Sequence, residues 1–165
     1  MCGICGILHL ENTTSNKQQR QQTVQAMNQA LHHRGPDEAG VYHDKMASLA
    51  MRRLSIIDLG GGQQPIFNEM GDVCVVFNGE IYNHKALEAG LDTPYEFRTK
   101  SDCEVILPLY QQKGLSFIDE LQGMFAFVLY DEEKDAYLIA RDHMGIIPLY
   151  TGYDEHGNLY VASEM

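Results

Sequence analysis

Apolar runs joined by short polar turns recur in the second half of this 165-residue chain. Gly123–Asp131 and Ala136–Arg141 flank the turn residues EEKD, and Ile147–Tyr153 and Leu159–Ala162 flank DEHG. Strand-forming runs separated by a few turn residues fold back on each other, so each pair predicts a β-hairpin. Hairpin strands pair antiparallel, which favours antiparallel sheets over a parallel α/β architecture.

Strands are also predicted in the first half of the chain. The expected segments are a first strand that includes Ile7 and Leu10, a hairpin of Val41–His43 and Ser48–Leu54, and Asp72–Phe77. The last segment is rich in β-branched residues, which favours a buried strand, and we expect it to end at Asn78-Gly79.

Three helices are expected between these strands. Lys17–His33 places Val24, Met27, Ala30 and Leu31 at helical spacing, and the RGPD segment then ends it. A short helix is expected to begin near Asn83.

The third helix, Asp102–Lys113, follows Ser101, and Glu104 completes a capping-box pattern with that serine. Pro108 lies inside this segment and predicts a kink or an early stop. Strands outnumber helices over the whole chain, so a few helices should cover antiparallel sheets.

Length and charge limit the classes of function. A chain of 165 residues fits one domain and can bury roughly 70% of its unfolded surface. Its formal net charge of −11 repels nucleic acid and anionic lipid, so neither is an expected partner. Four cysteines without a signal peptide indicate a cytoplasmic protein, and no apolar run approaches the ~18 residues that cross a bilayer.

Cys2 stands near the start of the chain, in MCGICG. Loss of one initiator methionine would make it the N-terminal residue, with a thiol and a free α-amine on adjacent carbons. An α-amine titrates near ~7.7–8.0, so a useful fraction is unprotonated at neutral pH. Such a residue holds a nucleophile and a proton acceptor together and requires no partner histidine.

Other interpretations of Cys2 are open. It could be a buried structural thiol, or it could form a zinc or redox CxxC with Cys5. Zinc needs two further ligands at close spacing, but Cys74 and Cys103 lie in no second CxxC and beside no histidine pair. A redox CxxC opens a helix, whereas this one leads into a predicted strand.

A Cys–His hydrolase is a further alternative, because the chain has seven histidines. They share no pattern, which favours solvated or packing roles for them. They are His9, His32, His33, His43, His84, His143 and His156.

Asn78-Gly79 has two interpretations. Asn-Gly is the commonest hairpin turn, but GEIYN leads here toward a helix rather than into a partner strand. A strand that ends in Asn-Gly can instead present a side-chain amide and an unobstructed backbone N–H together. Those are the two donors that an acyl-transfer oxyanion needs.

Arg53 and Asp102 are candidates for binding an amino acid. Alternation along the strand places Arg53 with Leu49 and Met51 on the apolar face, where a guanidinium needs an anion such as a carboxylate. A structural ion pair is the alternative. The helix dipole already favours Asp102 in a first turn, but in a shared pocket the two residues would recognise an α-ammonium and an α-carboxylate.

Seven motifs occur together in this chain: MCGICG, RGPD, RRLSIID, FNGEIYN, SDCEVI, GMFAFVLYD and RDHMGIIPLY. In this order they resemble the glutaminase domain of glutamine-hydrolysing asparagine synthetases, a class II glutamine amidotransferase family, over essentially the whole chain. The resemblance implies an α+β fold of the N-terminal nucleophile hydrolases, an αββα sandwich of two antiparallel sheets covered by helices. Residues 1–165 would form one such domain.

The resemblance also implies a reaction. Cys2 would attack the side-chain amide of L-glutamine while its own α-amine moves the proton, and Asn78 with the Gly79 N–H would hold the oxyanion. Ammonia would leave, and water would release L-glutamate, without a metal or cofactor. The implied substrate-binding residues, besides Asn78 and Gly79, are Arg53, Leu54, Ser55, Ile56, Ile57, Glu80 and Asp102.

In the family a C-terminal synthetase domain follows, and the resemblance implies that this chain lacks it. Ammonia would pass to that domain, which makes asparagine from aspartate, and ATP and magnesium are expected only there. A homodimer is compatible with the resemblance. The alternative is a non-catalytic domain, or an amidotransferase-like domain that donates ammonia to another acceptor.

Overall fold

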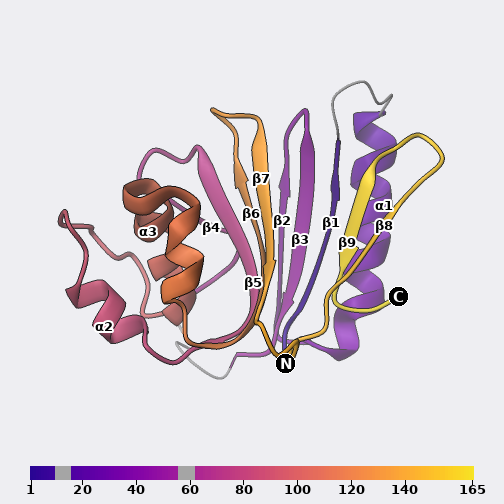
Figure 1. Ribbon diagram of the computed structural model, residues 1–165. Helices are drawn as coiled ribbons and strands as arrows, with labels where there is room; N and C mark the ends of the chain where they lie inside the picture. The colour runs from indigo at the N-terminus through magenta and orange to yellow at the C-terminus, as the bar shows by residue number, and fades with distance from the viewer. Residues whose placement is uncertain (10–15, 56–61) are drawn as a thin grey trace.

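Two β-sheets stack face to face between two layers of helices (Figure 1). The computed structural model describes residues 1–9, 16–55 and 62–165. The first sheet has the strand order β2-β3-β1-β9-β8, and all its pairings are antiparallel. Its strands are β1 Gly3–Leu8, β2 Glu38–His43, β3 Ala47–Arg53, β8 Tyr150–Tyr153 and β9 Leu159–Ala162.

The second sheet has the order β4-β5-β6-β7 and is also antiparallel. Its strands are β4 Ile66–Phe67, β5 Val73–Ile81, β6 Gly123–Asp131 and β7 Ala136–Arg141. The expected sandwich of two antiparallel sheets is therefore confirmed.

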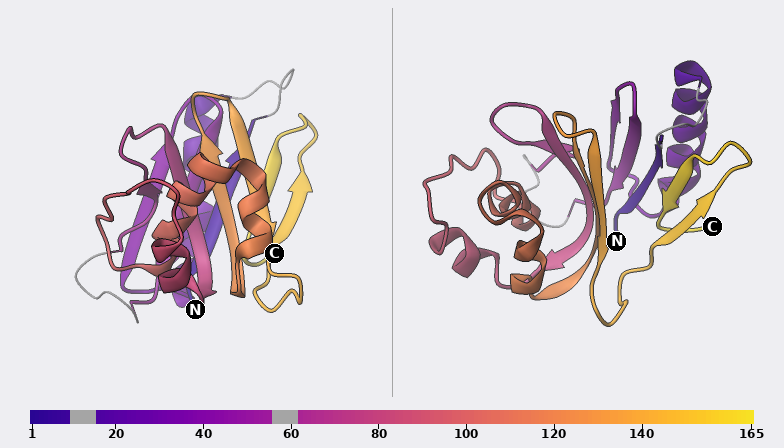
Figure 2. Two further views of the ribbon diagram at one scale, coloured as in Figure 1. Left: turned by 60° about the vertical axis from the view of Figure 1, so that its left-hand side comes forward. Right: turned by 45° about the horizontal axis from the view of Figure 1, so that its top comes forward.

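Helices cover the outer face of each sheet (Figure 2). Helix α1, Lys17–Ala30, continues into the 3₁₀ turn Leu31–His33 and packs on β1 and β3 of the first sheet. On the other side lie α2 His84–Ala89 and α3 Ile106–Lys113, with 3₁₀ turns Asp102–Val105 and Gly114–Glu120. None of the helices in the described ranges is long and apolar enough to cross a membrane.

Alternation along the strands separates the cores. On β1, Ile4 and Leu8 pack between the sheets, whereas Cys5 and Ile7 pack under α1 with Val24. The second sheet contributes four buried side chains to this same cluster: Cys74, Val76, Val128 and Tyr130. A third cluster, which includes Phe77, Ile106, Phe117 and Phe127, packs the second sheet against its helices.

The predicted hairpins are present with shifted ends. β6 and β7 have the predicted bounds, whereas β8 begins at Tyr150 rather than Ile147, and β2 begins at Glu38 rather than Val41. The two-residue strand β4 was not predicted. Residues 10–15, which include Leu10 of the expected first strand, lie outside the described residues.

The expected end of the strand at Asn78-Gly79 is wrong. β5 runs through both residues to Ile81, and Gly79 pairs with Phe125 of β6. Gly79 has a φ of 138°, and a Cβ there would overlap the carbonyl oxygen of Met124. The glycine therefore serves a close approach of two strands rather than a turn.

The buried face of α1 differs from expectation. Ala30 was placed on the apolar face of α1, but it is exposed, and Arg20 and Asn28 are buried instead. The Arg20 guanidinium donates to Ser48 Oγ at 3.0 Å and to the Asp44 carbonyl at 2.7 Å, which satisfies a buried charge.

The segment after Ser101 is helical as predicted, but the capping box is wrong. Ser101 makes no side-chain cap bond, and the Glu104 carboxylate accepts from the backbone nitrogens of Arg98 and Thr99, each at 2.8 Å. Pro108 does not stop the helix, because it lies in the first turn of α3, where no intrahelical N–H bond is required. The glutamate instead organises the turn that precedes the helix.

Candidate active site

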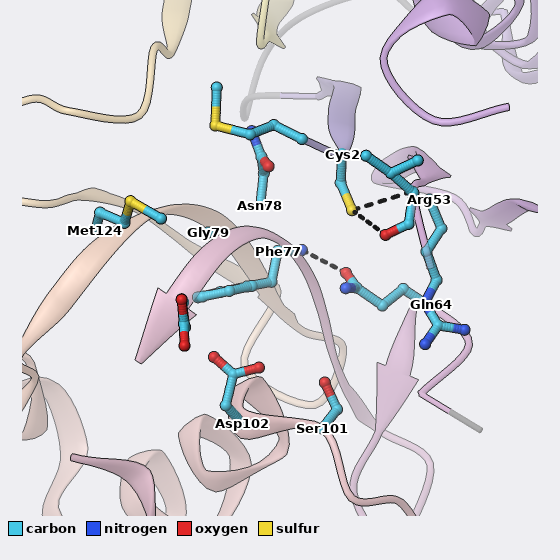
Figure 3. Close-up of a pocket in the computed structure, with 12 residues that line it drawn as sticks. Cys2, Arg53, Gln64, Phe77, Asn78, Gly79, Ser101, Asp102 and Met124 are labelled. Carbon is cyan, nitrogen blue, oxygen red and sulfur yellow. Dashed lines mark hydrogen bonds between the residues drawn. The ribbon is translucent and has the colours of Figure 1, made fainter. Parts of the chain in front are cut away.

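A pocket of about 150 Å³ opens where the start of β1, the end of β3 and the second half of β5 meet (Figure 3). Segments from both sheets and from the loop before α3 therefore form one cavity. Its lining residues are Met1, Cys2, Arg53, Leu54, Gln64, Phe77, Asn78, Gly79, Glu80, Ser101, Asp102 and Met124.

Cys2 directly precedes β1, and its side chain packs toward the space between the sheets. Its sulfur lies 3.4 Å from the backbone nitrogen of Leu54 and 3.8 Å from the Leu54 carbonyl oxygen. Cys5 packs on the opposite face of the sheet, under α1. The two thiols of the CxxC are thus not brought together, and neither the redox pair nor the zinc pair forms.

The other three thiols are buried, whereas Cys2 is half-buried. Burial raises the pKa of Cys5 and of Cys74 to about 12, and it also raises the pKa of Cys103. A thiolate is the reactive form of cysteine, so these three thiols are unreactive at neutral pH. Cys2 is the thiol that the fold leaves accessible to a substrate.

Asn78 presents an unsatisfied hydrogen-bond donor. The residue is 1% exposed, and its Nδ2 atom has no partner among the described residues. Buried side-chain amides are nearly always hydrogen-bonded, because an orphaned donor costs about 1–3 kcal/mol. An acceptor that is absent from the free protein, such as a substrate oxygen, would satisfy this donor.

Arg53 lines the pocket and also forms an ion pair, which was the alternative interpretation of this residue. It is buried, it lines the pocket, and its Nη1 atom lies 2.9 Å from Oε2 of Glu38. The parity argument is confirmed, since Leu49 and Met51 pack between the sheets. Glu38 was not identified from the sequence, and its carboxylate is a charge partner for the buried Arg53 guanidinium.

Asp102 lies on the opposite wall, at the start of the 3₁₀ turn before α3. Its Oδ2 atom accepts a hydrogen bond from the backbone nitrogen of Ile81 at 2.6 Å. Burial raises the pKa of the carboxyl, and the Ile81 N–H and nearby His84 oppose the rise. The sequence-predicted Glu80 also lines the pocket.

The segment after Arg53 is only partly at the pocket. Leu54 lines it, whereas Ser55 does not, and the Ser55 backbone nitrogen donates to Asp37 Oδ2 at 2.8 Å. Ile56 and Ile57 lie outside the described residues.

Four further residues line the pocket but were not identified as site residues from the sequence: Gln64, Phe77, Ser101 and Met124. Gln64 lies in the segment before β4, and its Oε1 atom accepts from the Phe77 backbone nitrogen at 2.6 Å. This bond fixes the loop against β5, beside Asn78 (Figure 3). No local pattern in the sequence indicates such a long-range bond.

Histidine chemistry finds no support at this pocket. No histidine lines it within the described part of the chain. Over residues 1–9, 16–55 and 62–165, no three histidine, cysteine, aspartate or glutamate side chains group to hold a metal ion. The pocket instead combines a thiol, an amide donor, a guanidinium and two carboxylates, which suits attack on an acyl group of an amino acid.

Comparison with known proteins agrees with this chemistry. The family described as "Glutamine amidotransferase domain" matches residues 1–165. Asparagine synthetase B [glutamine-hydrolyzing] of Escherichia coli (strain K12) is 55% identical over 165 residues, which are all of this chain and 29% of that protein. Asparagine synthetase [glutamine-hydrolyzing] 3 of Arabidopsis thaliana is 45% identical over 162 residues, 98% of this chain and 28% of that protein. The chain thus spans less than a third of these curated relatives.

A solved structure shares the fold. It is the glutamine phosphoribosylpyrophosphate (PRPP) amidotransferase from B. subtilis complexed with ADP and GMP, with a TM-score of 0.77. The similarity covers 98% of this chain and 41% of that one, at 21% sequence identity. The two chains therefore share one fold, which in this chain is a sandwich of two antiparallel sheets covered by helices.

Proposed function

Because the chain belongs to the glutamine amidotransferase domain family, we propose that it hydrolyses L-glutamine to L-glutamate and ammonia with Cys2 as the nucleophile. One observation carries the proposal: the unpartnered Nδ2 atom of Asn78 lies in the same pocket as the only accessible thiol among the described residues. A nucleophile and a donor for the developing oxyanion are the minimum for acyl transfer.

Substrate binding uses the charges at the two ends of the pocket. Arg53 would bind the α-carboxylate of glutamine, and Asp102 with Glu80 would contact the α-ammonium. A guanidinium and a carboxylate are complementary to these groups. The side-chain amide of glutamine would then extend toward the Cys2 sulfur.

Activation of Cys2 requires removal of Met1. Met1 lines the pocket and is 54% exposed, so its loss would enlarge the cavity as well as free the α-amine of Cys2. The α-amine accepts the thiol proton, directly or through one water, as the sulfur attacks the amide carbon. Asn78 Nδ2 and the Gly79 N–H then donate to the oxyanion.

Collapse of the tetrahedral intermediate breaks the C–N bond. The protonated α-amine gives its proton to the leaving nitrogen, which departs as ammonia and leaves a thioester on Cys2. The same amine then takes a proton from water as the water attacks the thioester. The carbon–sulfur bond then breaks, the protonated amine returns its proton to the sulfur, and glutamate leaves. The cycle therefore needs no metal or cofactor.

The names of the relatives support a proposal for the ammonia acceptor. We propose that ammonia passes to a C-terminal synthetase domain that makes asparagine from aspartate, and that ATP and magnesium act only in that domain. A cytoplasmic location and a homodimer are expected for such a biosynthetic enzyme. Light scattering of the natural protein tests the homodimer.

A different acceptor is the second candidate. The fold is shared with a glutamine phosphoribosylpyrophosphate amidotransferase, so the fold alone does not specify the acceptor. The acceptor is identified by supplying labelled glutamine and aspartate to the natural protein with ATP. Labelled asparagine supports our proposal, and its absence alongside rapid glutamate release contradicts it.

The glutaminase reaction is tested with substitutions at the two N-terminal thiols. Cys2→Ala should abolish glutamate release, whereas Cys5→Ala, which changes a thiol on the other face of the sheet, should keep it. Residues added before Cys2 should abolish release as well, because they convert the amine into an amide. Turnover by the extended protein at the wild-type rate would contradict the proposed base.

A further inference from the structure

Arg34, of the RGPD motif, contacts Cys2 from outside the pocket. Its Nε atom donates to the Cys2 carbonyl oxygen at 2.9 Å, and its Nη1 atom lies 2.8 Å from Oε1 of Glu164. Glu164 therefore reaches the nucleophile through one guanidinium. The steps described above use neither residue.

The guanidinium has few other constraints. The Arg34 side chain is 11% exposed, and its Nη2 atom is buried without a hydrogen-bond partner in the part of the chain that the structure describes. Its stem packs over Gly3, where a Cβ would stand 3.3 Å from Arg34 Cδ. Its orientation therefore depends on two bonds, one to Cys2 and one to Glu164.

Ser163 holds the backbone of Ile4, the residue that follows Gly3. It is fully buried, its Oγ atom accepts from the Ile4 backbone nitrogen at 3.0 Å, and its backbone nitrogen donates to the Ile4 carbonyl at 2.9 Å. Ser163 and Glu164 thus fix the backbone at Ile4 and, through Arg34, at Cys2.

His33 also faces Glu164. Its Nε2 atom lies 3.0 Å from Oε2 of Glu164 and 3.1 Å from Oε1, the carboxylate oxygen that also faces Arg34. Arg34 and His33 together lower the pKa of Glu164, so the carboxylate is charged at neutral pH. Arg34 and His33 therefore both contact Oε1 of the Glu164 carboxylate, and His33 also contacts Oε2.

We propose that Glu164, acting through Arg34, and Ser163, acting through Ile4, are positioning residues that orient Cys2 for attack. This inference rests on the proposed glutaminase function. Removal of Met1 breaks the peptide bond before Cys2. The backbone of Cys2 is then held by the bond that its carbonyl accepts from Arg34 and by the peptide bond to Gly3. A fixed carbonyl limits rotation of the amine and the thiol, which keeps the sulfur aligned with the amide carbon near Asn78. Small misplacements of reacting atoms can lower rates by about 100-fold.

The test compares three substitutions in the natural protein. Glu164→Ala should lower kcat for glutamine hydrolysis about 10-fold and leave KM within about twofold, because Glu164 does not line the pocket. Glu164→Gln should stay within about threefold of wild type, since its amide oxygen still accepts from Arg34. Glu155→Ala, at an acidic side chain that is 88% exposed, is the matched control and should change neither constant.

A chemical readout separates positioning from folding. The rate at which a glutamine-like diazo-ketone labels Cys2 should fall about 10-fold in Glu164→Ala, while the labelled fraction at completion stays at one per chain. Ser163→Ala should slow labelling in the same way. A merely structural role would lower the labelled fraction and the melting temperature together, and would leave the rate per active site unchanged.

Several outcomes would overturn the inference. They are a Glu164→Ala enzyme with wild-type kcat and labelling rate, a change in KM alone, or a loss explained by the fraction of inactive protein. If wild-type protein labels at Cys2 and hydrolyses glutamine while Glu164→Ala behaves like wild type, only this inference fails. If the wild-type protein does neither, the proposed function fails.

Discussion

The sulfur of Cys2 lies 3.4 Å from the backbone nitrogen of Leu54, a residue 52 positions away in the chain. This contact joins the start of β1 to the end of β3, and β3 also carries Arg53. The thiol and the guanidinium therefore enter the pocket from adjacent strands of one sheet. A substrate held at Arg53 has its reacting end within the same small cavity as Cys2.

Arg53→Lys should raise KM for glutamine about 10- to 100-fold with a smaller effect on kcat. An ammonium cannot reproduce the two-pronged geometry of a guanidinium on a carboxylate, and bonds to charged groups contribute about 1.5–3 kcal/mol each. Steady-state kinetics of glutamate release measure both constants. Glu38→Gln, which removes the buried charge partner but keeps an acceptor, should raise KM less.

Asn78→Ala should lower kcat about 100- to 1,000-fold, because it removes one of the two donors to the oxyanion. The substitution should lower the free energy of unfolding little, because Asn78 Nδ2 has no hydrogen-bond partner among the described residues. Urea unfolding and steady-state kinetics measure the two effects.

Asn68 is the matched control, because its side chain is hydrogen-bonded within the protein and does not line the pocket. Its Oδ1 atom accepts from the backbone nitrogens of Gly71 and Val73, and it lies outside the pocket. Asn68→Ala should therefore cost about 1–3 kcal/mol of stability and leave kcat unchanged. An Asn78→Ala enzyme with wild-type kcat would remove the proposed oxyanion donor.

Asp102→Asn should raise KM for glutamine about 10- to 100-fold, because a charged partner of the α-ammonium is lost. It should also change the dependence of stability on pH. Burial raises the Asp102 pKa above its ordinary 3.8, so the folded protein binds this proton more tightly than the unfolded chain. The wild-type protein therefore loses stability from this group as the pH rises from about 3.8 through the raised pKa.

Asp102→Asn has no titratable carboxyl at this position, so it does not lose stability as the pH rises. Its amide oxygen still accepts from the Ile81 nitrogen. The free energy of unfolding of Asp102→Asn, relative to wild type, should rise between about pH 4 and pH 7. Urea denaturation across this range measures it. A relative stability that falls over the same range would mean that Asp102 is stabilised as the charged form.

Gly79→Ala should destabilise the protein by more than Gly71→Ala does. Both glycines have positive φ, 138° and 79°, which a side chain tolerates poorly. A Cβ at Gly71 meets nothing within 4 Å, whereas one at Gly79 would overlap the Met124 carbonyl. We expect roughly 1 kcal/mol for Gly71→Ala from backbone strain alone. Equal losses in chemical denaturation would show that the approach of β5 to β6 does not require a glycine.

The order of the strands could be predicted from the sequence where pairing is local. EEKD and DEHG are turn segments between strands of two short hairpins, and the structure contains both hairpins. Arg53 could be placed because the period of a strand is two and its neighbours Leu49 and Met51 are apolar. These inferences use only residues close in the chain.

Features that depend on distant segments could not be predicted. Asn78-Gly79 has the local chemistry of a turn, but the strand continues because β6 pairs with it over its whole length. Ser101 and Glu104 have the spacing of a capping box, but Glu104 bonds to the chain before the helix. Glu38 and Gln64 complete the site through contacts that no local pattern encodes.

The most direct test is mass spectrometry of the protein after reaction with a glutamine-like diazo-ketone. The account predicts one adduct per chain, on the Cys2 sulfur, in molecules that have lost Met1, with the buried Cys5, Cys74 and Cys103 unlabelled. Labelling on another side chain, or glutamine hydrolysis that persists in molecules whose Cys2 amine is still blocked by Met1, would contradict it.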